Sequence, residues 1–92
     1  MTGSAKVVTH QSRLESVLLQ VSEKYRLTRR ENHVLRLVVM GLSNKEIGGC
    51  IGISANTVKA LLRLIMLKMS ASSRAGIMAT VMSLALDVEE HS

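Results

Sequence analysis

Residues 44–59 read NKEIGGCIGISANTVK, and this stretch decides the fold. Ile47 and Ile51 are four residues apart, so they share one face of a short helix. Gly48 leaves room for a second backbone to approach, and Gly52 supplies the left-handed conformation that ends a helix at little cost. A second helix follows, with a predicted buried face of Val58, Leu61, Leu62 and Ile65. The pattern predicts a helix-turn-helix, a motif that usually reads the major groove of DNA.

Capping signals place further helices on both sides of this motif. A serine or threonine followed three residues later by glutamate can form a capping box, and such pairs begin at Ser12, Thr28 and Ser43, while Ser54 heads a fourth run alone. We expect helices over 13–25, 29–40, 44–51, 55–69 and 74–88, and no strand. The predicted fold class is all-α, a helix-turn-helix bundle of four helices with an additional N-terminal helix. We expect a flexible tail over residues 1–11 and a helical domain over residues 12–92.

The net charge of +5 is unevenly distributed along the 92 residues, a length that suits one small domain. Residues 27–68 carry seven basic and two acidic side chains, hence +5, whereas residues 1–26 carry +2 and residues 69–92 carry −2. The positive charge therefore lies on the helix-turn-helix, where a phosphate backbone would need it.

No segment resembles a membrane span or a signal peptide. The longest uncharged runs, among them residues 75–86, have 12 residues, against about 20 needed to cross a bilayer. A single cysteine, Cys50, excludes an intrachain disulfide. We expect a cytoplasmic, nucleoid-associated protein.

The last helix is apolar around most of its circumference, which is more than one core face needs. Such an excess often marks an interface, and we expect a homodimer with Met78, Val81, Met82 and Ala85 at its interface. The alternative is that the first helix, with its apolar stripe of Leu14, Val17, Leu18 and Val21, covers this surface.

An ordered series of residues runs from Leu27 to Arg74. It comprises LTRRE at 27–31, VL at 34–35, GLSNKEI at 41–47, ISxxTVK at 53–59, KM at 68–69 and SR at 73–74. In this series the chain resembles the DNA-binding domain of the LuxR family of bacterial transcription regulators. The resemblance implies that a recognition helix, residues 55–69, enters the major groove and that the last helix pairs two subunits.

The expected DNA contacts divide into base-reading and phosphate-binding residues. The resemblance places Lys59, Ala60 and Arg63 against the bases, and helical periodicity independently puts Asn56 on the same outward side as Lys59 and Arg63. Lysine and arginine can donate to guanine, asparagine can pair with adenine, and alanine can touch a thymine methyl group. Helix starts suit phosphate, and the candidates there are Thr28, Asn44, Lys45 and Thr57.

Leu64 and Leu67 depart from the family pattern, which is normally polar at these positions. We expect at least one of them to pack against the N-terminal helix. The alternative function is a protein-interaction module that keeps the helix-turn-helix fold but binds a partner regulator through Leu64, Leu67 or the terminal helices. Leu61 replaces the usual histidine and should tighten packing. Cys50 is expected to be an ordinary thiol, because redox sensing would need a depressed pKa.

Neither an enzyme nor a metal site is predicted. The three histidines and the cysteine lack the tight spacing of metal ligands. The chain has no phosphate-cradling glycine loop and no nucleophile elbow. The expected partners are therefore double-stranded DNA and a second copy of the chain, without a membrane, a cofactor or a small-molecule ligand.

Overall fold

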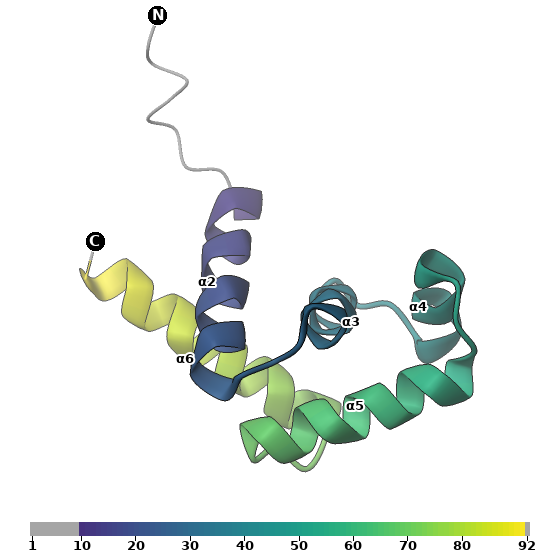
Figure 1. Ribbon diagram of the computed structural model, residues 1–92. Coiled ribbons are helices and arrows are strands. Elements are labelled where there is room, and N and C mark those ends of the chain that lie inside the picture. Colours follow the sequence, from purple (N-terminus) through teal and green to yellow (C-terminus); the bar gives the residue numbers. More distant parts are fainter. Residues whose placement is uncertain (1–9, 92) are drawn as a thin grey trace, which may run out of the picture.

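The computed structural model describes residues 10–91, and the side chains of residues 13–87. Over these residues the chain forms helices only, which confirms the predicted all-α fold with an additional N-terminal helix. The five helices are α2 (His10–Tyr25), α3 (Arg29–Val39), α4 (Asn44–Ile51), α5 (Ala55–Met69) and α6 (Arg74–His91) (Figure 1).

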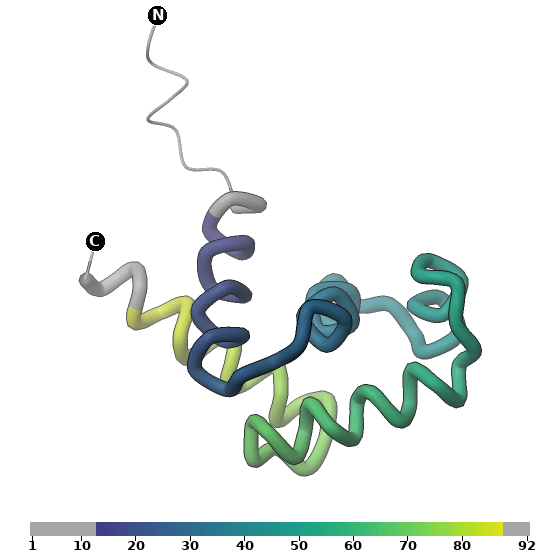
Figure 2. The backbone as a smooth tube through the Cα atoms, in the orientation of Figure 1, coloured from purple at the N-terminus to yellow at the C-terminus, as the bar shows by residue number. Residues whose placement is uncertain are grey.

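The helices surround α3. In Figure 1, α2 and α6 lie on one side of α3, α4 lies on the other, and α5 runs along the lower edge. α5 packs against α3, α4 and α6, and α2 packs against α3 and α6. The coloured ends of the tube in Figure 2, in α2 and α6, lie on the same side, away from α4. The start of α2 and the end of α6 therefore lie on the side of the molecule opposite α4.

Every helix contributes to one hydrophobic core. Val34, Leu35, Ile47 and Ile65 are completely buried at its centre. The predicted face of α5 lies toward this core, with Val58, Leu62 and Ile65 buried, while Leu61 is half-buried against the core's edge. α2 adds Val17, Leu18 and Val21 from its apolar stripe.

Polar contacts hold α2 against α3. The Asn32 side-chain amide donates to the Leu18 carbonyl oxygen at 3.3 Å and to the Ser22 hydroxyl. Arg36 Nη2 lies 2.7 Å from Glu15 Oε1, and both side chains are partly exposed. Because exposed ion pairs contribute little, the apolar contacts of α2 carry most of this packing.

Two of the three predicted capping boxes are confirmed. Thr28 Oγ1 accepts from the backbone N–H of Glu31 at 3.1 Å, and the Glu31 carboxylate accepts from the Thr28 N–H at 2.8 Å. Ser43 and Glu46 repeat this arrangement at the start of α4. The prediction of a capping box at Ser12 was wrong, because α2 begins at His10 and Ser12 lies inside the helix.

The turn between α4 and α5 confirms the roles of its glycines. Gly52 has φ = 76°, in the left-handed region, and its N–H donates to the Gly48 carbonyl oxygen at 2.8 Å. A Cβ at Gly48 would lie 2.4 Å from the Ile53 carbonyl oxygen, so only glycine fits there. The two helices turn through 104°, within the range of about 90–120° that is typical of a helix-turn-helix.

The helix ends differ from expectation by a few residues. α2 begins two residues inside the segment expected as a tail, and α6 continues to His91 instead of ending at residue 88. The rest of the expected tail, residues 1–9, lies outside the described residues. Within residues 10–91, no single helix is long and apolar enough to cross a membrane, and α4 with α5 reaches that length and composition only as a sharply bent pair.

Candidate nucleic-acid interface

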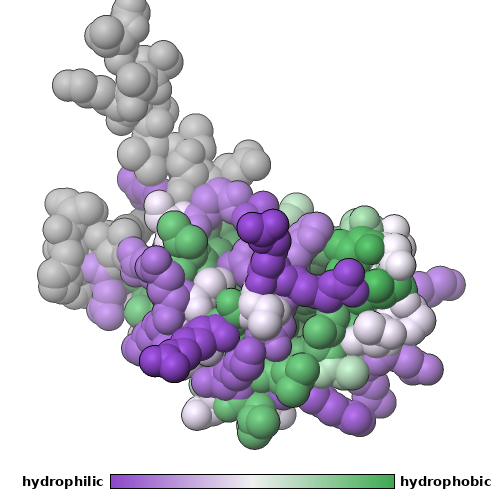
Figure 3. Space-filling model, viewed as in Figure 1, coloured by the Kyte–Doolittle hydropathy of each residue, from purple (hydrophilic) through white to green (hydrophobic). Residues whose placement is uncertain are grey.

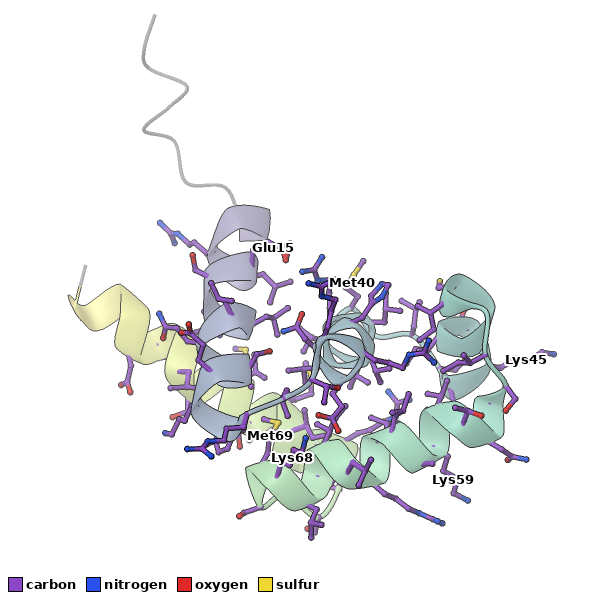
Figure 4. The ribbon with its side chains drawn as sticks, in the orientation of Figure 1. Glu15, Met40, Lys45, Lys59, Lys68 and Met69 are labelled. Atoms are coloured by element: carbon purple, nitrogen blue, oxygen red, sulfur yellow. The ribbon has the colours of Figure 1, made fainter. Side chains whose placement is uncertain are left out.

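α5 presents one face to the core and the opposite face to solvent. Its sequence contains neither glycine nor proline, its N-cap is Ser54, and its last residue precedes Ser70 in the left-handed conformation. All four predicted base-reading residues are exposed on the solvent side: Asn56, Lys59, Ala60 and Arg63. In Figure 4, Lys59 projects away from the helical bundle, whereas Met69 points inward.

The basic side chains on this outward face have no acidic partner within the part of the chain that the structure describes. α5 contains no acidic residue. Ion pairs join Glu15 to Arg36 and Glu31 to Lys68, whereas within the described residues no ion pair joins Lys59 or Arg63 to an acid. Exposed cations without internal partners suit a polyanionic ligand.

Lys68, although it belongs to the same helix, has a structural role. Its Nζ lies 2.6 Å from Glu31 Oε1 and 3.3 Å from the carbonyl oxygen of Arg26. Figure 4 shows Lys68 on the side of α5 that faces α3. The contact ties the end of α5 to the start of α3 and gives Lys68 an acidic partner.

The buried Glu31 carboxylate is held in its charged form. Burial raises the pKa of Glu31, but hydrogen bonds from Lys68 and Thr28, with the charge of Lys68, outweigh it and lower the pKa below its ordinary value of 4.5. Ionised Glu31 can therefore accept from Lys68 and from the Thr28 N–H at the same time.

Two predicted phosphate-binding threonines lie at opposite ends of α5. Thr28 is exposed beside Glu31, and Glu31 contacts Lys68, so Thr28 lies near the C-terminal end of α5. Its hydroxyl oxygen accepts from the backbone N–H of Glu31, which leaves the O–H free to donate. Thr57 is exposed in the first turn of α5, and its hydroxyl lies 2.9 Å from the Ser54 hydroxyl. Hydroxyl groups therefore lie near both ends of α5.

The other two candidates begin α4. Arg74 donates through Nη1 to the Leu42 carbonyl oxygen at 3.2 Å and through Nη2 to Asn44 Oδ1. With its oxygen occupied, Asn44 offers its amide N–H groups to a ligand. Lys45 is exposed and projects from the start of α4, away from the bundle (Figure 4). Sequence reasoning missed the contact from Arg74, since 30 positions separate it from Asn44 and no local pattern signals it.

The expectation for Leu64 and Leu67 was wrong. Leu64 is 46% exposed and Leu67 is 77% exposed, so neither is covered by the N-terminal helix. The physical reason is that the apolar stripe of α2 packs against α3 and α6 and not over the outward face of α5.

The predicted dimer residues divide between core and surface. Val81 is buried within the chain's own core, together with Ile77, where α2 packs against α6. Met78 and Ala85 are half-buried, whereas Met82 is 56% exposed. The first helix therefore covers part of the apolar surface of α6 and leaves the side bearing Met82 open.

The remaining features of the described residues are the side chains of metal-binding type, two surface grooves and the cysteine. No group of three or more histidine, cysteine or acidic side chains lies close enough to hold a metal ion within that part of the chain. A surface groove of about 430 Å³ lies between α2 and α3, and one of about 310 Å³ lies between the end of α2 and α6; neither is lined by a residue of α5. Cys50 is exposed on α4 as a free thiol.

The comparison with protein families agrees with this geometry. The model of the LuxR family of bacterial regulatory proteins matches residues 25–81, more than half of the chain. The chain therefore belongs to this family, which is one of DNA-binding regulators and not of enzymes. No curated protein and no solved structure matches the chain.

Proposed function

We propose that this protein binds double-stranded DNA sequence-specifically as a transcription regulator, with α5 in the major groove. The observation that carries the proposal is the outward face of α5. Lys59 and Arg63 stand there on successive turns, exposed and without an acidic partner among the described residues. A helix with its apolar side in the core and its cations outward matches the usual arrangement of a recognition helix.

The chemistry of this face supports base reading. Lys59 and Arg63 can donate to guanine O6 and N7, and Asn56 can pair with the N6 and N7 atoms of adenine. Ala60 is short enough for the helix to approach the base edges, and its methyl group can contact that of thymine.

The surrounding donors support phosphate binding. Thr28 and Thr57 lie near the two ends of α5, and their exposed hydroxyl groups can donate to phosphates of the DNA backbone. Lys45 and the Asn44 amide at the start of α4 add a charge and N–H donors that fit further phosphate contacts.

We further propose that two copies associate through the exposed side of α6, where Met82 lies. Val81 supports this surface from within the core. A dimer would place two recognition helices on two half-sites, so the expected operator is an inverted repeat.

A second candidate function is the protein-interaction module, because both Leu64 and Leu67 are exposed. Two leucines open to solvent on one helix are a feature of protein-binding surfaces. Against this candidate, a partner seated on the leucines would also have to accommodate Lys59 and Arg63 on the same face.

A mobility-shift assay against genomic fragments at about 50 mM and about 200 mM salt tests the proposal. Specific binding predicts that a few fragments remain shifted at the higher salt in the presence of random competitor DNA. Equal binding of all fragments that disappears at the higher salt would contradict specificity. A complete absence of binding at the lower salt would favour the protein-interaction module.

A further inference from the structure

Leu64 adjoins the proposed base-reading residues. It follows Arg63 directly and lies one helical turn after Ala60, and 46% of its surface is exposed. Figure 3 shows hydrophobic side chains reaching the surface along α5, at the lower edge of the view, with hydrophilic ones beside them. Leu64 therefore lies next to Ala60 on the exposed side of α5.

Their positions along α5 separate Leu64 from Leu67. A recognition helix contacts base edges mainly through its N-terminal residues. Leu67 lies about 4.5 Å farther along the helix axis than Leu64, toward the C-terminal end of α5. Leu64 is therefore the nearer of the two leucines to the base-reading turns.

The chemistry of the groove restricts what a leucine can read there. Base edges in the major groove present donors and acceptors, and the apolar group among them is the 5-methyl group of thymine. A leucine against a donor or acceptor would leave that polar group without a partner, which is unfavourable. Against a methyl group it removes apolar surface from water, which is favourable.

We propose that Leu64 is a specificity-determining residue that reads the 5-methyl group of a pyrimidine beside the base contacted by Arg63. The inference rests on the proposed function, because it requires α5 to lie in the major groove. Thymine and 5-methylcytosine carry the same methyl group, and the experiment distinguishes them.

The test replaces the thymines of a selected operator, one at a time, by uracil, which lacks only the methyl group. Affinities are measured for the native protein, Leu64→Ala and Leu67→Ala. We expect one uracil to weaken the native protein about fourfold, the size of effect for one methyl group lost from an apolar contact. Leu64→Ala should bind the thymine operator less tightly and be insensitive to that uracil, while Leu67→Ala should behave as the native protein does.

A second arm changes the sensitive base pair to cytosine–guanine, with and without a 5-methyl group on the cytosine. Tighter binding of the methylated form by the native protein, but not by Leu64→Ala, would show that the methyl group itself is read. If methylation has no effect at that pair, Leu64 reads thymine alone.

Two results would overturn the proposal: Leu64→Ala binding with native affinity, or uracil effects that are the same with and without Leu64. Lys59→Ala and Arg63→Ala measured alongside separate this failure from that of the proposed function. If these variants lose operator affinity while Leu64 shows no dependence on the methyl group, only the inference about Leu64 fails. If they too bind normally, α5 does not read the groove and both proposals fail.

Discussion

Replacing Gly48 with alanine should destabilise the fold, although alanine is the better helix former. The added Cβ would lie 2.4 Å from the Ile53 carbonyl oxygen, 3.4 Å from the Ser54 carbonyl carbon and 3.5 Å from the Ala55 nitrogen. All three are backbone atoms, so no flexible side chain can move aside. The Gly48 carbonyl oxygen also accepts from the N–H groups of Gly52 and Ile53, at 2.8 and 3.0 Å, which pins the turn to α4.

The size of the effect follows from two opposing contributions. Alanine gains about 1 kcal/mol over glycine in a helix interior. Overpacking of a tight contact typically costs about 1–3 kcal/mol, and a contact this short against backbone belongs at the upper end. The net destabilisation should be about 2 kcal/mol, which corresponds to a drop in Tm of roughly 8–16 °C for a domain of this size.

Gly49 provides the matched control, since a Cβ there has nothing within 4 Å. Gly49→Ala makes the same substitution in the same helix but introduces no clash. It should therefore raise Tm by a few degrees, because alanine is the better helix former. Thermal unfolding followed by circular dichroism, at equal protein concentration, compares the two variants with the native chain. If Gly48→Ala unfolds at or above the native Tm, the clash between a Cβ at position 48 and the turn does not destabilise the protein, and the reasoning is refuted.

Three further predictions follow from other contacts. The pKa of Glu31 is lowered in the folded state, so the ionised carboxylate should stabilise the fold above pH 4.5, and this contribution should be lost as the pH falls through the folded pKa. In denaturant titrations, the free energy of unfolding should therefore fall less on acidification for Glu31→Gln than for the native chain. Lys45→Ala should weaken binding to operator and random DNA alike and flatten the slope of log affinity against log salt by about one unit, whereas a loss confined to the operator would contradict a phosphate contact. Met82→Glu should abolish self-association in sedimentation runs and leave a folded monomer, because the side chain is exposed, whereas Val81→Glu, which buries a charge in the core, should unfold the chain. A native protein that is monomeric at tens of micromolar, both free and on DNA, would refute the proposed dimer.

Much of the fold could be predicted because its signals are local. Thr28 with Glu31 and Ser43 with Glu46 specify helix starts within four residues, and Gly52 marks a helix end by its conformational freedom. The apolar spacing of α5 likewise determines its buried face. At Ser12 the same local pattern failed, because α2 begins upstream at His10.

The remainder depends on contacts between distant residues. Lys68 is one of the seven basic residues counted over 27–68 in the sequence, but it pairs with Glu31, 37 positions away, and only the packing of α5 on α3 brings them together. The exposure of Leu67 depends on where α2 packs. The sequence of α2 shows an apolar stripe but not whether that stripe packs against α6 or against α5. Val81 shows the same limit, since apolar residues in the core and at an interface are alike in sequence.

The central claim, that α5 reads bases through Lys59 and Arg63, is tested most directly by repeating operator selection with the native protein, Lys59→Ala and Arg63→Ala. Both side chains are exposed, so the variants should keep the native Tm. Each should lose about 1–3 kcal/mol of operator affinity and relax base preference at one position of each half-site, while keeping its preference elsewhere. Selected sequences and affinities identical to those of the native protein for both variants would contradict the claim.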